Sequence, residues 1–147
     1  MTKVHAYLNF NGNCDEAFRH YQQVFKCERM SLVRFGDVPV SDSYTISAAD
    51  KDKIMHTSIL ISHDTILMGS DVIKGFGHKP AAGNRMYVLL DCETRKEATR
   101  LFTALSKDAK SLEMELKETF FAEQYGSFVD KFGVGWMIVY TGNKDAI

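Results

Sequence analysis

Two histidines are the side chains in this sequence best suited to acid–base or metal chemistry. His5 lies in the apolar run Val4–Phe10, and His56 lies in the run Ile54–Ser62. Neutral imidazole ligates transition metals and titrates near neutrality, so either residue could hold an ion or move a proton. A hydrogen-bonded strand histidine is the plainer alternative for each, and the pattern assigns no catalytic residue.

Arginine and aromatic side chains are the other groups that could bind a ligand. Arg85 carries a planar guanidinium that suits a carboxylate or phosphonate, although it could equally lie in water at the start of a strand. Aromatic rings could stack on a planar ligand, or they could simply fill the core. The aromatic set is Tyr7, Tyr87, Phe120, Phe121, Tyr125 and Trp136.

Charge and cysteine content exclude several classes of protein. The 147 residues carry 18 Lys and Arg against 19 Asp and Glu, without a basic block, so we expect no nucleic-acid partner. The three cysteines form no CxxC pair, which favours reduced thiols in the cytoplasm over disulfides or a zinc knuckle. Because no stretch reaches about 18 consecutive apolar residues, we expect no membrane partner.

The first half of the chain predicts a strand, a helix and three further strands. Val4–Phe10 is the first strand, and Asn13 is the expected cap of a helix whose apolar stripe ends near Lys26. Three more strands are predicted at Glu28–Phe35, Ile54–Ser62 and Thr65–Ser70.

The second half repeats this order. Thr94 and Glu97 form a capping box that begins a second helix. Strands are predicted at Arg85–Asp91, Leu112–Leu116, Phe120–Val129 and Val134–Tyr140. A shift of 81 residues carries Asn13 onto Thr94, which favours a duplicated module over two unrelated helices.

Duplication predicts an α+β fold in which two βαβββ modules form a cupped mixed sheet with the helices outside. We expect a single domain over residues 1–147, with one module at about 1–71 and the other at about 84–147. Strand alternation directs His5, Tyr7 and Asn9 away from the helix and toward the hollow of the sheet. The same alternation places His56 on the side of His5.

Several motifs resemble the vicinal-oxygen-chelate superfamily, which includes glyoxalase I, extradiol dioxygenases and bleomycin and fosfomycin resistance proteins. The resemblance is strongest to its PhnB-like branch and spans essentially the whole chain. It implies the glyoxalase-like fold and commonly a homodimer, but not one reaction. The motifs are Tyr7–Cys14, Glu16–Phe18 with Tyr21, Arg34–Asp37, Asp52–His56, Leu67–Asp71, Glu118–Phe121 with Tyr125-Gly126, and Asp130–Ile138.

The same resemblance implies where a metal ion would sit. Glyoxalase-like members use one side chain from each of the first, fourth, fifth and eighth strands. Those positions fall on His5, Met68, Arg85 and Val139, of which His5 alone is a good ligand for such an ion. We therefore expect no metal cofactor, with a divalent metal held by His5 and His56, and Asp71 nearby, as the alternative.

These patterns together predict a protein that binds a small organic molecule in the cavity of its sheet, without an obligatory metal. A metal-dependent lyase, isomerase or dioxygenase is the competing function, and a ferredoxin-like interaction module is a third. The methyltransferase label that some relatives carry is not supported, because the strand-to-helix turns Asn11–Asn13 and Cys92–Thr94 are not glycine-rich. The expected pocket comprises His5, Tyr7, Asn9, His56, Met68, Arg85, Tyr87 and Tyr125.

Overall fold

The computed structural model describes residues 1–39 and 45–144. The chain divides into two compact units, Met1–Ala81 and Ala82–Ile147. The first contains β1 (Ala6–Phe10), α1 (Cys14–Phe25), β2 (Arg29–Arg34), β3 (Ile54–Ser62) and β4 (Thr65–Asp71), with short 3₁₀ turns at Phe35–Asp37 and Ala48–Asp50. The second contains β5 (Val88–Asp91), α2 (Arg95–Leu105), β6 (Ser111–Lys117), β7 (Gln124–Val129) and β8 (Gly135–Tyr140).

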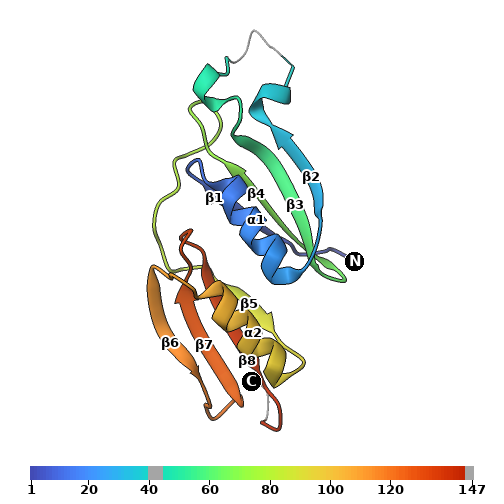
Figure 1. Cartoon of the computed structure of the whole chain (residues 1–147), viewed down its shortest axis with the longest axis vertical. Coiled ribbons are helices and arrows are strands. Elements are labelled where there is room, and N and C mark those ends of the chain that lie inside the picture. The colour runs from blue at the N-terminus through green and yellow to red at the C-terminus, as the bar shows by residue number, and fades with distance from the viewer. Residues whose placement is uncertain (40–44, 145–147) are drawn as a thin grey trace. The chain divides into compact units, whose positions relative to one another are not determined.

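Each unit forms one four-stranded mixed sheet (Figure 1), with strand orders β1-β4-β3-β2 and β5-β8-β7-β6. The pairs β1–β4 and β5–β8 are parallel, and the other pairs are antiparallel. The expected order of a strand, a helix and three strands is therefore confirmed in both units. This is the module arrangement that the resemblance to the glyoxalase-like fold implies.

Helix α1 covers one face of the first sheet because its apolar stripe is continuous. Phe18 and Tyr21 are completely buried on the sheet side of the helix. A Cβ atom added to Gly69 of β4 would lie 2.6 Å from the Phe18 ring, so the glycine lets the helix approach the sheet closely. Gly69 thereby marks the face of the sheet that α1 covers.

The start of α1 differs from the local cap that the sequence predicts. Asn13 occupies the N-cap position but makes no side-chain capping hydrogen bond. The Asp71 carboxylate replaces it, since Oδ1 accepts hydrogen bonds from the amides of Gly12 (3.0 Å) and Cys14 (2.9 Å). Its Oδ2 accepts from the amide of Ile54 at 2.8 Å, so this buried side chain joins α1, β3 and β4.

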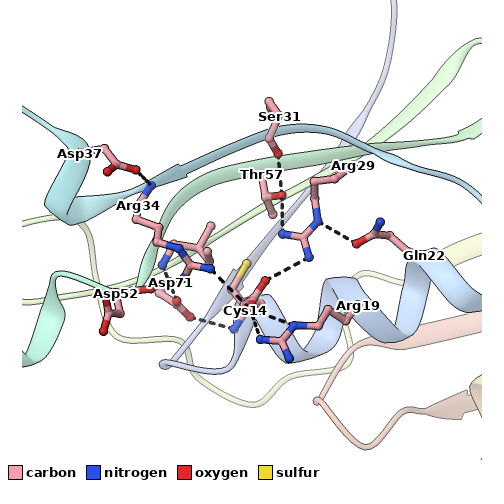
Figure 2. Close-up of polar contacts among 12 residues, drawn as sticks. Cys14, Arg19, Gln22, Arg29, Ser31, Arg34, Asp37, Asp52, Thr57 and Asp71 are labelled. Carbon is pink, nitrogen blue, oxygen red and sulfur yellow. Dashed lines mark hydrogen bonds and ion pairs between the residues drawn. The ribbon is translucent and has the colours of Figure 1, made fainter.

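A second polar network joins α1 to β2 (Figure 2). The Arg29 guanidinium donates to Asp15 (3.0 Å), to Gln22 (2.9 Å) and to Thr57 of β3 (3.2 Å). Arg19 also donates to Asp15. Burial alone would raise the pKa of Asp15, but the hydrogen bonds from Arg19 and Arg29 outweigh it and hold that pKa below the ordinary value.

Replacing Asp15 with asparagine is expected to destabilise the protein in a pH-dependent way. Because the pKa of Asp15 is lowered in the folded state, its contribution is complete above the unfolded-state pKa of about 3.9 and disappears as the pH falls through the folded-state value. Urea denaturation should show Asp15→Asn to be less stable than the parent by about 1 kcal/mol at pH ~7, with the difference shrinking below pH ~4. The same change at Asp64, which lies at the exposed β3–β4 turn, is the control. A difference that stayed constant down to acid pH would contradict the assigned role of the carboxylate.

The core of the second unit lies between α2 and the face of the sheet that α2 covers. The Thr94 side chain accepts the Glu97 amide at 3.1 Å, which is one of the two hydrogen bonds of the predicted capping box. The Glu97 carboxylate accepts hydrogen bonds from Arg100. Trp136, Ile138 and Phe128 are completely buried. The Phe102 ring of α2 packs edge-on against Phe128, with ring centroids 5.3 Å apart.

Three predicted strands start two or more residues too early, each at a point where a side chain or a turn interrupts the pairing. Val4 is 83% exposed and lies before β1, because the His5 ring takes the Ile66 amide that a longer strand would bind. Arg85 is exposed and lies before β5, since pairing with β8 begins at Trp136, after the turn at 130–134. Phe120 lies in a turn closed by Thr119 and Ala122, so β7 starts at Gln124 instead.

None of the helices among the described residues is long and apolar enough to cross a membrane.

Candidate functional site

The face of the first sheet that α1 does not cover presents a mixed row of side chains. Leu8 pairs with Gly69 on the helix side, so the neighbouring pair Tyr7 and Met68 points to the opposite face. The register continues this row through Ser58 of β3 to Ser31 of β2. The two serine hydroxyls are hydrogen-bonded at 2.8 Å. The row thus offers an aromatic ring, a thioether and hydroxyl groups for binding.

Tyr7 and His56 form the most distinctive contact on this face. The Tyr7 phenol oxygen lies 3.3 Å from His56 Nδ1, and the ring centroids are 5.8 Å apart. Tyr7 is 47% exposed, so this pair is accessible rather than buried. Asn9 pairs with Ser70 and projects to the same face. Tyr7, Asn9, His56 and Met68 of the expected pocket therefore share one sheet face.

His5 is engaged in the sheet itself. Its Nδ1 accepts the Ile66 backbone amide at 3.0 Å, immediately before β1 begins. This hydrogen bond continues the β1–β4 ladder with a side chain in place of a carbonyl. Nδ1 of His5 is therefore occupied by a structural contact.

On the uncovered face of the second sheet, Tyr87 crosses the strands toward an acidic residue. Its ring lies over Gly135, where an added Cβ would be 2.8 Å from the ring. The Tyr87 hydroxyl donates to both carboxylate oxygens of Glu113, at 2.8 and 2.6 Å. This hydrogen bond is the largest cause of the raised pKa of Tyr87, followed by burial, the charge of Glu113 and the neighbouring Tyr125.

Sequence reasoning missed Glu113. Register shifts occur on both sides of Met114 in β6, so simple alternation does not assign its neighbours to a face.

Tyr125 does lie on the uncovered face, paired with Val139 and Lys117. Tyr125 also touches Phe121, with centroids 5.1 Å apart. Arg85 lies outside the strands and is exposed, whereas Trp136 of the aromatic set belongs to the core.

The four implied metal positions do not fit a metal ion. Met68 offers a thioether, Val139 offers no donor atom, and Arg85 is cationic and outside the strands. His5 Nδ1 already accepts an amide, and His56 Nδ1 faces Tyr7. Asp71 is 3% exposed and binds three backbone amides. Across residues 1–39 and 45–144, no three His, Cys, Asp or Glu side chains cluster in a way that could hold an ion.

The two buried cysteines, Cys14 and Cys92, are poor nucleophiles. Burial raises the pKa of the Cys92 thiol to about 11 and raises the pKa of Cys14 still further, with nearby Asp71 adding to the effect on Cys14. Because the thiolate is the reactive form, neither residue is activated for covalent chemistry.

Comparison with known proteins identifies relatives along nearly the whole chain. The model of the family described as 3-demethylubiquinone-9 3-methyltransferase matches residues 2–139. Protein YjdN of Escherichia coli (strain K12) is 31% identical over 138 residues, covering 90% of each chain. The crystal structure of protein PA1353 from Pseudomonas aeruginosa is 34% identical, covers 95% of this chain and 98% of its own, and superposes with a TM-score of 0.82.

More distant structures share the fold. A PhnB protein from Bacillus cereus is 24% identical, covering 95% of this chain and 99% of its own, with a TM-score of 0.69. The fosfomycin resistance protein FosX from Mesorhizobium loti is 13% identical, covering 97% and 92%, with a TM-score of 0.53. From its motifs, its paired modules and these matches, the chain belongs to the PhnB-like family described as 3-demethylubiquinone-9 3-methyltransferase, which has the glyoxalase-like fold.

Proposed function

We propose that this protein binds a small organic molecule on the helix-free faces of its sheets, without an obligatory metal ion. The observation that carries the proposal is the exposed Tyr7–His56 pair, whose polar atoms lie 3.3 Å apart on a sheet face that α1 leaves uncovered. Binding sites typically combine apolar and aromatic surface with a few convergent polar groups. Met68, Asn9 and Ser58 surround the pair with that mixture.

A metal-dependent lyase, isomerase or dioxygenase is less well supported. A catalytic transition-metal centre usually has three protein ligands and an open position. The side chains at the family's ligand positions include a thioether, a guanidinium and an aliphatic group, so the donor set argues against an ion in that place.

Methyl transfer, the activity in the family's description, also lacks support from the chain. Nucleotide-type cofactors are commonly held by the amides of a glycine-rich turn at the start of a helix. At the start of α1 the amides of Gly12 and Cys14 already bind the Asp71 carboxylate. At the start of α2 the Glu97 amide binds Thr94, and the Cys92 amide binds the Val139 carbonyl.

Thermal-shift screening tests the ligand-binding function. The panel consists of small carboxylic acids, phosphonates and hydrophobic antibiotics, because a molecule that binds the native state raises its apparent stability. At a ligand concentration of about 100 times Kd, the stabilisation should be about 2.7 kcal/mol. A panel without any stabilising compound would contradict the proposal.

Variants of the Tyr7–His56 pair locate the bound molecule. For a ligand that binds on the first sheet, we expect Tyr7→Leu and His56→Ala to reduce the thermal shift that the ligand causes. The reduction should correspond to about tenfold weaker binding, because each change removes one member of the exposed pair. His63→Ala is the matched control, since His63 lies at the exposed β3–β4 turn, 93% exposed. Equal shifts in all three variants would place the ligand elsewhere.

Metal analysis distinguishes the competing enzyme. Protein purified without chelator should contain no stoichiometric transition metal. A stoichiometric metal that is lost in His5→Ala would refute the metal-free proposal and favour the lyase, isomerase or dioxygenase alternative.

We also propose that the protein is a cytoplasmic homodimer. The family resemblance supports the dimer, and the three free cysteines support a reducing compartment. Sedimentation equilibrium at the mass of a 16.7 kDa monomer would contradict the dimer.

A further inference from the structure

We propose that the uncovered face of the second sheet binds a small organic cation, held by the Glu113 carboxylate among the rings of Tyr87, Tyr125 and Phe121. This inference rests on the proposed function, because it assigns ligand binding to a helix-free sheet face. It adds the chemical class of the ligand and a residue, Glu113, that the family's ligand positions do not include.

The carboxylate of Glu113, on the edge strand β6, is held by a hydrogen bond from the opposite edge of the sheet. The Tyr87 hydroxyl holds both oxygens of Glu113, at 2.8 and 2.6 Å, and the Tyr87 ring is seated on Gly135. A carboxylate has about four lone-pair sites, so the Tyr87 hydroxyl does not saturate it and its negative charge still attracts an organic cation. An exposed glutamate on a strand would otherwise sample many rotamers, and this hydrogen bond removes part of that entropy cost in advance.

Tyr125, Phe121 and Phe120 form a chain of ring contacts that begins on the same face as Tyr87. Tyr125 lies on the same face, near enough to contribute to the raised pKa of Tyr87. Phe121 packs edge-on against Tyr125, and Phe120 packs edge-on against Phe121 with centroids 5.2 Å apart. Ring faces attract cations, most strongly quaternary ammonium groups, and a neighbouring carboxylate adds a direct charge interaction.

The adjacent row of the sheet suits the apolar part of such a ligand. Leu89, Met137, Ser127 and Met114 follow one another across the four strands in register. Leu89 is 52% exposed, so apolar surface is available in this row of the sheet. The predicted ligand is therefore an ammonium group attached to a small apolar body.

Other charged groups on this face allow substitutions that should either strengthen or weaken the binding of a cation. Asp91 and Lys117 lie at the two ends of the row Asp91–Val139–Tyr125–Lys117. Lys117 is exposed on the edge strand, where its ammonium group opposes a bound cation or competes with it for Glu113. Removing Lys117 should therefore strengthen cation binding, whereas removing the charge of Glu113 should weaken it.

Calorimetric titration of the full chain with choline provides the test, and its uncharged isostere 3,3-dimethyl-1-butanol is the matched control ligand. We expect choline to bind about tenfold more tightly than the alcohol. Glu113→Gln should lose about tenfold in choline affinity, Lys117→Gln should gain about twofold or more, and Glu93→Gln, the same change at an exposed turn, should alter nothing. Circular dichroism melting should show that all three variants remain folded.

Distinct results would overturn the inference. Equal affinity for choline and the alcohol, or an unchanged affinity in Glu113→Gln, would exclude a cation site at Glu113. Loss of choline binding in Tyr7→Leu but not in Glu113→Gln would place the cation on the first sheet. If panel compounds bind while choline does not, this inference fails and the proposed function stands. If neither choline nor any panel compound binds, both fail.

Discussion

Replacing Asp71 with alanine is expected to lower the free energy of unfolding by about 3–5 kcal/mol. Its carboxylate accepts three backbone amides, from Gly12, Cys14 and Ile54, and the side chain is 3% exposed. Alanine leaves the amides of Cys14 and Ile54 buried without an acceptor. It also removes the negative charge from the start of α1, where the helix dipole favours it.

Chemical denaturation followed by far-ultraviolet circular dichroism measures this loss. Asp71→Asn should cost less than Asp71→Ala, because the amide oxygen still accepts hydrogen bonds while the charge is lost. Asn13→Ala is the informative companion: Asn13 makes no side-chain capping bond, so its replacement should change stability by less than about 0.5 kcal/mol. If Asn13→Ala were the more damaging change, the long-range cap would be contradicted.

This contrast shows which features of the fold local sequence could predict. The bounds of α1 follow from the spacing of its apolar residues, and that spacing is a property of adjacent turns. The group that satisfies the first amides of the helix lies 57 residues from Cys14 along the chain, so no local pattern identifies it. The asparagine at the expected cap position has the right type but not the contact.

Strand ends were mispredicted for a related reason. Residue type marks Val4 and Arg85 as continuations of apolar runs, but a strand continues only where a partner supplies hydrogen bonds. Before β1, the Ile66 amide of the partner strand β4 is already bonded to the His5 side chain. At the other site, β8 begins to pair with β5 only after a tight turn. Pairing across a sheet is a tertiary property, and strand propensity depends on that context.

The candidate site likewise contains residues that the local sequence could predict and one residue that it could not. Alternation along β1 and β3 was enough to predict that Tyr7, Asn9 and His56 would share a face. The reason is that β1 pairs with β4 without a register shift, and the nearest shift in β3 lies before His56. Glu113 was not predicted, because β6 is irregular around Met114. In addition, its hydrogen-bond donor Tyr87 reaches it across Gly135, and no local pattern in the sequence indicates that contact. Sheet irregularities frequently re-aim side chains near functional sites, so a residue of this kind is found from coordinates rather than from periodicity.

Replacing Asp130 with alanine is expected to cost a similar amount, about 3–5 kcal/mol, in the second unit. The side chain is 1% exposed and accepts three hydrogen bonds of 2.9 Å, from the amides of Phe132 and Val134 and from Trp136 Nε1. It thereby fixes the turn that aligns β8 with β7 and also satisfies the indole of the largest core residue. A cavity beside Trp136 adds to the cost of the unpaired donors.

Trp136 is the single tryptophan of the chain and reports on this change directly. In the parent, its buried indole should fluoresce at short wavelength. Asp130→Ala should shift that emission to longer wavelength at denaturant concentrations where the parent is still folded, because water reaches an indole that has lost its acceptor. Asp91→Ala, at an exposed strand residue of the same unit, should leave both the emission and the transition midpoint close to those of the parent. An Asp130→Ala protein with parental emission and midpoint would mean that the turn is held by its backbone bonds, Asp130 N–H to the Val134 carbonyl and Gly133 N–H to the Asp130 carbonyl, rather than by the carboxylate.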